Sequence, residues 1–378
     1  MTSEVKSDNK ETIFIYREQK FPLDQLLGHS FAKNAVSPHL ASTIAFLREW
    51  INEKDYVLIK TSGSTGKPKQ IKIAKSKMIE SAKATIATLT LPGGCSALLN
   101  LNTAFIGGKM MIVRALLNHM KLFIGELSAS PFSAVRLKEK IDFYAFVPYQ
   151  LHKILIENPE RIKQLNQAKC IILGGAPVSL NLQKLIQDDL KVEVFSTYGM
   201  TETVSHVALK QLNSASDDEF FKALKGISFS ADNSDRLIIH APHIAIENPL
   251  FTNDVVRLIN NTSFKWLGRH DFVINSGGIK IYPEALEAEI SNLLLRQNTF
   301  FNFIIFPLAD EKLGEKVCLL IEDEKAKERV DWKQLFLSLP KYERPKEVHH
   351  LKAFLMTESG KINRVKTIEL LKEKRNLS

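Results

Sequence analysis

Thr61-Ser-Gly-Ser-Thr-Gly-Lys-Pro-Lys69 is the stretch of this sequence that says most about its fold. The run directly before it, Asp55-Tyr-Val-Leu-Ile-Lys60, predicts a buried strand that leads straight into the loop. After the loop, a helical pattern of apolar residues extends from Lys75 to about Leu89. This order, with small residues between a strand and a helix, predicts a phosphate-binding loop.

The composition of this loop suits a polyanionic ligand. Four of its nine residues carry hydroxyl groups, two are glycines and two are lysines. Gly63 and Gly66 allow a tight turn that brings backbone N–H groups close to phosphate, while the hydroxyls donate and Lys67 adds charge. Pro68 stands where a Walker A loop has Ser or Thr, which disfavours an ordinary P-loop NTPase. The residues expected to bind phosphate are Thr61, Ser62, Gly63, Ser64, Thr65, Gly66 and Lys67.

Strand-like and helical patterns alternate through the chain around the loop. The expected strands cover residues 96–101, 143–147, 170–173 and 192–195. The expected helices cover residues 37–52, 148–158 and 180–189. This alternation predicts an α/β architecture with parallel strands.

The character of the sequence changes after Gly226. Short strands, expected to be antiparallel, cover residues 236–240, 255–259 and 264–267. From about Gly268 the pattern becomes a strand, a Gly-Gly turn, a helix, two strands, a helix and a polar tail. Since 378 residues exceed what one core usually supports, we expect two domains. We predict a large α/β domain over residues 1–270 and a smaller, mobile α+β domain over residues 271–378.

The bulk composition excludes several classes of protein. Hydrophobic residues make up 44% and charged residues 25%, as in soluble globular proteins, and no run of about 18 apolar residues predicts a membrane span. The polar start is unlike a secretory signal, and three scattered cysteines argue against a disulfide framework, so we expect a cytoplasmic protein. The net charge of +9 is spread over the chain. It favours a solvated surface that attracts anionic ligands over nucleic-acid binding.

The loop at residues 61–69 resembles the phosphate-binding motif of the adenylate-forming superfamily, which includes acyl-CoA synthetases, luciferases and adenylation domains. Ser196-Thr-Tyr-Gly-Met-Thr-Glu-Thr203 resembles a second motif of that family. The resemblance implies that Tyr198, followed by Gly199, stacks on adenine, that Thr201 contacts a phosphate and that Glu202 holds Mg²⁺. Gly174-Gly-Ala-Pro177 is similar to the segment that lies against the adenine and the acyl group, which implies roles for Gly174, Gly175 and Ala176.

The segment Gly268-Arg-His-Asp-Phe-Val-Ile-Asn-Ser-Gly-Gly resembles the hinge motif between the two domains of these ligases. The resemblance implies that Arg269 meets the ribose or a phosphate and that Asp271 is the pivot of the small domain. It also implies that Gly277 and Gly278 line the channel for the pantetheine arm of CoA, where bare backbone leaves room.

Near the end of the chain, Thr357-Glu-Ser-Gly-Lys-Ile-Asn-Arg364 resembles the segment that carries the family's catalytic lysine, here Lys361. Its charge would stabilise the oxygens between the acid and the α-phosphate. The family's ribose motif, usually Thr-Gly-Asp, reads Thr252-Asn-Asp254, and we expect Asn253 to accept the left-handed backbone of a loop there. Asp254 would bind the ribose hydroxyls. The early phosphate loop implies an abbreviated N-terminal region.

Residues 99–114 look like the acyl-pocket segment of short o-succinylbenzoate–CoA ligases of menaquinone synthesis. The resemblance implies that Phe105 packs on an aromatic ring, that Arg114 holds the carboxylate that is not activated, and that His206 reaches the pocket. We therefore expect an ATP-, Mg²⁺- and CoA-dependent acid–CoA ligase, with o-succinylbenzoate as the first candidate acid. The open alternatives are another aryl or fatty acid, an aminoacyl-adenylating domain, and a non-catalytic nucleotide-binding protein. The oligomeric state stays open, and neither nucleic-acid binding nor stable membrane insertion is expected.

Overall fold

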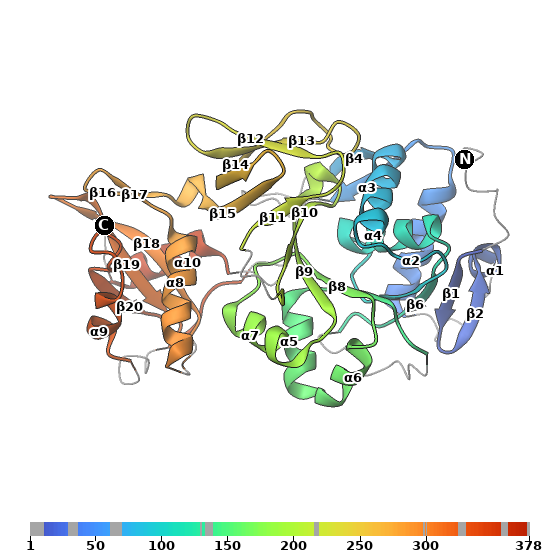
Figure 1. The fold of residues 1–378 in the computed structure, drawn as a ribbon, viewed down its shortest axis with the longest axis horizontal. Coiled ribbons are helices and arrows are strands. Elements are labelled where there is room, and N and C mark those ends of the chain that lie inside the picture. Colours follow the sequence, from blue (N-terminus) through green and yellow to red (C-terminus); the bar gives the residue numbers. More distant parts are fainter. Residues whose placement is uncertain are drawn as a thin grey trace. The chain divides into compact units, whose positions relative to one another are not determined.

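The computed structural model describes residues 11–28, 37–60, 70–128, 131–132, 139–214, 219–297, 299, 301–323, 330–356 and 362–375. The chain forms two compact units (Figure 1). The first comprises Met1–Ser230, Ile239–Leu250 and Asn260–Phe264, and the second comprises Ala231–Ile238, Phe251–Ile259 and Lys265–Ser378. The predicted domain boundary at Asp271 is the residue about which the small domain is expected to rotate, and it stays a prediction.

A largely parallel sheet forms the centre of the first unit. Its strands lie in the order β11-β10-β9-β8-β7-β5-β6-β1-β2. From β9 to β1 all neighbours are parallel, which confirms the predicted α/β class, while β2, β10 and β11 pair antiparallel. The strands are β1 (Ile13–Tyr16), β2 (Gln19–Pro22), β5 (Ser96–Leu99), β6 (Lys121–Ile124), β7 (Phe143–Phe146), β8 (Cys170–Leu173), β9 (Glu193–Gly199), β10 (His206–Gln211) and β11 (Phe221–Ala223).

The helices of the first unit begin where the sequence supplies caps. Ser37 and Ser179 are N-caps whose side chains accept hydrogen bonds from Leu40 N and Leu182 N, each at 3.2 Å. α3 lies beside α4, and α5 lies beside α7 (Figure 1). The helices are α1 (Leu23–Gly28), α2 (Pro38–Ile51), α3 (Lys75–Thr88), α4 (Ile106–Leu117), α5 (Pro148–Glu157), α6 (Ile162–Leu165) and α7 (Leu180–Asp189), with a short 3-10 turn η2 (Pro159–Arg161) before α6.

The phosphate loop joins two strands, which corrects the predicted order of elements. The strand predicted before the loop is present as β3 (Tyr56–Lys60), and the helix predicted at Lys75 is present as α3. Between loop and helix lies an unpredicted strand, β4 (Gln70–Ala74), which pairs antiparallel with β3 in a separate sheet. Alternation in Gln-Ile-Lys-Ile-Ala carried that signal, because Ile73 points into the core.

The second unit contains a small mixed sheet with helices. Its strand order is β17-β16-β19-β18, and β20 pairs with β19. Strands β12 to β15, on which the division between the units falls, are neighbours in that order. The strands are β12 (Ser228–Ala231), β13 (Arg236–His240), β14 (Leu250–Asn260), β15 (Ser263–Arg269), β16 (Ile274–Ser276), β17 (Ile279–Ile281), β18 (Phe303–Asp310), β19 (Gly314–Ile321) and β20 (Glu347–His350). The helices are α8 (Pro283–Arg296), α9 (Trp332–Leu337) and α10 (Arg364–Arg375).

The polar tail predicted at the end of the chain is wrong. Residues Arg364–Arg375 form α10, in which Thr367 and Leu371 are fully buried. Leu371 packs in an apolar cluster with Leu320 and Phe354. A few apolar residues are enough for this highly charged helix to form, because packing against other parts of the chain stabilises it. The local sequence pattern does not reveal that packing.

Glu284, in the first turn of α8, is partly buried beside the ion pair of Arg364 and Glu287. Arg364 donates to both carboxylate oxygens of Glu287, at 2.9 and 2.5 Å, so Glu284 receives only part of the charge compensation. Burial raises the pKa of Glu284 to about 7. Since its unfolded pKa is about 4.3, the folded state holds the proton longer, and stability falls as pH rises between about 4.5 and 7.

Glu284→Gln should therefore stabilise the second unit more at high pH than at low pH. We expect the gain to grow by roughly 2–3 kcal/mol between about pH 4.5 and pH 8, measured by thermal unfolding. Ser291→Ala, in the same helix, is the matched control, since it removes no titratable group and its effect should not depend on pH. An equal gain at both pH values would contradict the raised pKa.

Candidate active site

The sequence-predicted site residues divide into three sets. The phosphate-loop residues Thr61–Lys67 and the proposed catalytic Lys361 lie outside the described residues. The remaining residues fall within one unit or the other. The first unit holds Phe105, Arg114, Gly174, Gly175, Ala176, Tyr198, Gly199, Thr201, Glu202 and His206, and the second holds Asp254, Arg269, Asp271, Gly277 and Gly278.

Thr201 and Glu202 lie on a short 3-10 turn, η3 (Thr201–Thr203), which follows β9. The residue after this turn, Val204, has a strained backbone. Val204, fully buried, has φ +65° and ψ −50°, and Ser205 N donates to Thr203 O at 2.7 Å. These values describe a γ-turn, which is rare and strained for a β-branched residue. Thr203 Oγ1 accepts from Met200 N at 2.9 Å and donates to Ser205 O at 2.7 Å, which ties the turn from both sides. Strain of this kind clusters at functional sites.

Gly199 is required by close packing at the end of β9. A Cβ atom there would lie 2.6 Å from Cα of His206 and closer still to the backbone oxygen of Ser205. The β9–β10 pairing is irregular between His206 and Ala208, where the register shifts. No side chain fits between these backbones. Gly199 is therefore required for the backbone conformation at the end of β9, and any role in the nucleotide site depends on that conformation.

Gly199→Ala should lower the stability of the chain by about 1–3 kcal/mol, because the added methyl group forces backbones apart. Thermal unfolding measures the effect. Gly93→Ala is the matched control, since Gly93 has no positive φ and a methyl group there would meet no atom of the described residues within 4 Å. Equal unfolding temperatures for both variants would contradict the close approach.

Tyr198 and the loop after β8 adjoin the same end of the sheet. The Tyr198 ring packs edge-on against the Phe264 ring, with 5.0 Å between the ring centroids, and is tilted against the Phe221 ring, with 5.6 Å between the centroids. Gly174 follows β8, and a Cβ atom there would lie 2.7 Å from Oγ1 of Thr197 on β9. Gly175 adopts φ +84°, which favours glycine. Because the carboxyl ends of parallel strands form ligand crevices, this placement fits a nucleotide.

Arg114 is buried in α4 without an acidic partner among the described residues. It is 2% exposed, and burial lowers the pKa of its guanidinium to about 10. Its Nη2 donates to Ser205 Oγ at 2.7 Å, and Nη1 contacts Met111 Sδ at 3.9 Å. Nε has no hydrogen-bond partner in the described part of the chain. A buried cation in this state is costly unless an anion compensates its charge.

His206 and Arg114 both contact Ser205, and their place in one substrate pocket stays a prediction. Nδ1 of His206 lies 3.4 Å from Ser205 Oγ, and its Nε2 lies 3.1 Å from Thr85 Oγ1. Burial first, and then the charge of Arg114, hold the pKa of His206 well below its usual value, so the ring is neutral. The sequence did not indicate Thr85 or Ser205. Ser205 at least stands between two predicted residues, Glu202 and His206.

Phe105 lies apart from this cluster. It precedes α4 as its N-cap residue and is 44% exposed, whereas Arg114 is in the last turn. Nine residues of helix correspond to about 13 Å of rise and to opposite faces. Contact between Phe105 and an aromatic substrate stays a prediction.

In the second unit, Asp254, Arg269 and Asp271 form one charged group. Arg269 Nη2 lies 2.6 Å from Asp271 Oδ2, and Nη1 lies 3.9 Å from Asp254 Oδ1. Asp254 is buried and accepts a hydrogen bond from Trp266 Nε1 at 3.3 Å. The predicted ribose-binding carboxylate, its neighbouring arginine and the predicted pivot are thus brought together. Asn253 Nδ2 also donates to Asp271 Oδ1, at 3.2 Å.

The expected left-handed loop at Asn253 is wrong. Residues 252–254 lie within the eleven-residue strand β14, and Asn253 has no positive φ. Thr252 Oγ1 donates to Leu237 O at 2.9 Å and accepts from Asp254 N at 3.1 Å, so the strand itself orients the carboxylate. The glycine of the family's usual motif is therefore dispensable in this chain.

Gly277 and Gly278 form the two-residue turn of the β16–β17 hairpin. Their φ values are +59° and +81°, and both residues are exposed. Two positive φ values in a two-residue loop are typical of a type I′ turn. The turn itself explains both glycines, and their role in a CoA channel stays a prediction.

A family model described as AMP-binding enzyme matches residues 3–225. The chain belongs to the AMP-binding enzyme family. The 2-succinylbenzoate–CoA ligase of Bacillus cereus (strain ATCC 10987 / NRS 248) is 24% identical, over 97% of this chain and 80% of that protein. The solved structure of an acyl-CoA synthetase (AMP-forming)/AMP-acid ligase II-like protein from Dyadobacter fermentans DSM 18053 is 35% identical, with a TM-score of 0.61 over 92% of this chain and 97% of that one.

O-succinylbenzoate coenzyme A synthetase (MenE) from Bacillus subtilis, solved in complex with ATP and magnesium ion, is 17% identical, with a TM-score of 0.72 over 97% of this chain and 98% of that one. At the level of the family, these findings confirm the expected adenylate-forming enzyme, an AMP-forming acid–CoA ligase. In the described part of the chain, no helix combines the length and apolar composition needed to cross a bilayer.

Proposed function

We propose that this AMP-binding enzyme converts o-succinylbenzoate, ATP and CoA into o-succinylbenzoyl-CoA, AMP and pyrophosphate, a step of menaquinone synthesis. The observation that carries the proposal is the buried guanidinium of Arg114 without an acidic partner in the described residues. Support also comes from the names of relatives that align with 97% of the chain. The three free, buried cysteines suit a reducing, cytoplasmic setting.

A dicarboxylic acid would compensate the charge of Arg114. One carboxylate would be activated, and the other would pair with the guanidinium, whose unpartnered Nε offers a further donor. Neutral His206 and the Ser205 hydroxyl next to Arg114 would supply polar contacts without adding a competing charge. A fatty acid has no group for this cation, and its binding would leave the desolvation penalty in place.

In the first half-reaction, a carboxylate oxygen of the acid would attack the α-phosphorus of ATP, and pyrophosphate would leave. Resemblance to the family assigns the phosphates to residues 61–67 and Thr201, the adenine to Tyr198 with Gly174–Ala176, and the ribose to Asp254 and Arg269. Lys361 would stabilise the charge that develops on the oxygens between acid and phosphate. Glu202 has no ion-pair partner in the described residues and would hold Mg²⁺, which prefers oxygen ligands.

In the second half-reaction, the CoA thiol would lose its proton, its sulfur would bond to the acyl carbon, and AMP would leave with the bonding electrons of the acyl–phosphate oxygen bond. We propose that the small domain pivots about Asp271 between the two steps. The pantetheine arm of CoA would then run along the Gly277–Gly278 turn, because the exposed backbone of this turn carries no side chains.

Pyrophosphate release from MgATP with a panel of acids tests this function. We expect release that depends on o-succinylbenzoate, together with consumption of CoA when CoA is added. Release with another aryl or fatty acid would keep the ligase and overturn the substrate. No release with any acid, together with measurable ATP binding, would favour the non-catalytic nucleotide-binding protein.

A further inference from the structure

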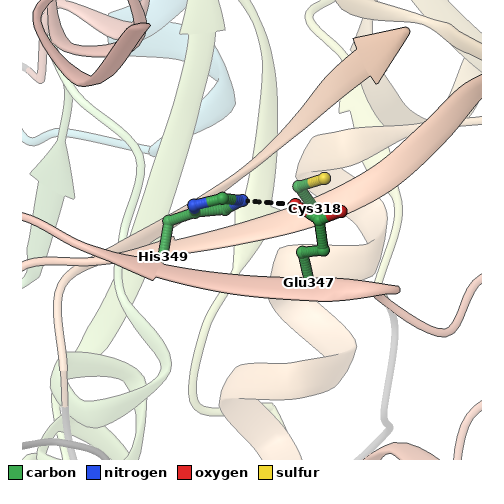
Figure 2. Close-up of side chains that lie close together, drawn as sticks. All are labelled: Cys318, Glu347 and His349. Atoms are coloured by element: carbon green, nitrogen blue, oxygen red, sulfur yellow. Dashed lines mark hydrogen bonds and ion pairs between the residues drawn. The ribbon is translucent and has the colours of Figure 1, made fainter. Parts of the chain in front are cut away.

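Three metal-binding side chains gather on one face of the small sheet in the second unit. Cys318 comes from β19, and Glu347 and His349 come from β20, which pairs with β19 in parallel. The register sets Cys318 opposite Glu347 and Leu320 opposite His349. Because residues two positions apart on a strand share a face, the three side chains lie on the same side of the sheet (Figure 2).

Their donor atoms are close enough to share one ion. The Cys318 sulfur, a Glu347 carboxylate oxygen and a His349 ring nitrogen all lie within 4.8 Å of one another. Nε2 of His349 lies 3.0 Å from Oε2 of Glu347 (Figure 2). Donor atoms of a tetrahedral zinc site are about 3.3–3.8 Å apart, so only small side-chain shifts are needed. Among the described residues, no other group of His, Cys, Asp and Glu has this geometry.

We propose that Cys318, Glu347 and His349 bind a divalent cation of the zinc class. A thiolate favours soft or borderline ions, whereas Mg²⁺ and Ca²⁺ require oxygen ligands. Three protein ligands leave the fourth tetrahedral position to water or to a further ligand. On binding, the S–H bond of Cys318 breaks, its proton passes to solvent and a sulfur–metal bond forms.

Neighbouring side chains already orient two of the three ligands, Glu347 and His349. Lys316 Nζ lies 2.5 Å from Oε1 of Glu347, so the other carboxylate oxygen faces His349. The Phe306 ring stands edge-on to the His349 ring at 5.6 Å. Partners of this kind fix the orientation of metal ligands and raise affinity. Glu347, whose side chain is 38% exposed, provides the path from solvent to the two buried ligands.

Packing alone does not account for this group. Cys318 belongs to an apolar cluster with Phe306, Leu320 and Leu371, where a buried thiol by itself acts as a small apolar side chain. The carboxylate of Glu347 already pairs with Lys316 and His349, yet the carboxylate and the imidazole both stand beside the Cys318 sulfur, within reach of one ion. A bound cation would join all three groups.

The test is a titration of the full-length, untagged, reduced and metal-free chain with Co²⁺, followed by Zn²⁺. We expect a single Co²⁺ to bind with the charge-transfer absorption of a thiolate–cobalt bond, and Zn²⁺ to remove that absorption. Cys318→Ser should abolish the absorption, and Glu347→Gln should weaken Co²⁺ binding at least about tenfold.

Two controls match these variants. Cys170→Ser removes an equally buried free thiol from the first unit, and His350→Gln removes a buried imidazole that faces the other side of β20. Both should keep the absorption. If Cys318→Ser fails to fold, by circular dichroism, Glu347→Gln decides the outcome, because its side chain is half-exposed.

Absence of the absorption in the wild-type chain would overturn the site, as would unchanged binding in Glu347→Gln. The readout is metal binding itself, so it is independent of the proposed ligase. Failure to activate any acid would leave this result standing, and a failed titration would leave the ligase standing.

Discussion

Lys361→Ala should slow acyl-adenylate formation by about 100- to 1,000-fold, the usual effect of removing one preorganised group that stabilises transition-state charge. Negative charge spreads over the oxygens between the acid and the α-phosphate as pyrophosphate leaves, and the lysine cation would stabilise it there. Thioester formation from preformed acyl-adenylate should fall much less, because the resemblance to the family gives Lys361 no part in the attack by the CoA thiol.

Separate assays of the two half-reactions make this prediction sharp. Pyrophosphate release reports the first step, and thioester formed from synthetic o-succinylbenzoyl-adenylate and CoA reports the second. Lys366→Ala, an exposed lysine of α10 near the same end of the chain, is the matched control and should retain both rates. Equal losses in the two steps of Lys361→Ala would remove the assigned role and indicate general damage to the site.

Local sequence pattern predicted the elements whose own residues show that they are buried or where they begin. The strands β5, β7 and β8 are apolar at nearly every position, and α7 begins after a serine cap, so both kinds of element were predictable. β20, Glu-Val-His-His, and the charged helix α10 gave no such signal. Their stability comes from pairing with β19 and from packing around Leu371, which depend on residues far away in the chain.

The candidate site shows the same division. The motifs that resemble the family supplied residues such as Glu202 and Asp254, because each motif is continuous in the sequence. The strained turn at Val204 has no local signal, since valine is a poor residue for positive φ and only the surrounding hydrogen bonds hold it there. The burial of Arg114 was equally hidden, because it depends on Ser205, 91 residues away.

That burial leads to the prediction about substrate choice. Arg114→Met should reduce kcat/KM for o-succinylbenzoate by about 30- to several-thousand-fold, which corresponds to the 2–5 kcal/mol typical of removing one partner of a buried charge pair. The same variant should act almost normally on a monocarboxylic analogue that lacks the carboxylate that is not activated. Pyrophosphate release with both acids measures the ratio, and Arg48→Met, at an exposed arginine of α2, is the control.

Unfolding of the ligand-free variant separates substrate recognition from structural support. Methionine has a similar length and no charge, so replacing an uncompensated buried cation should leave stability unchanged or raise it. If stability is unchanged or higher and only the activity on the dicarboxylic acid is lost, then the guanidinium serves to bind the ligand and does not stabilise the fold. A large loss of stability, or equal losses for both acids, would show that Arg114 supports the packing of α4 against Ser205 and His206, and the proposed substrate would lose its main physical support.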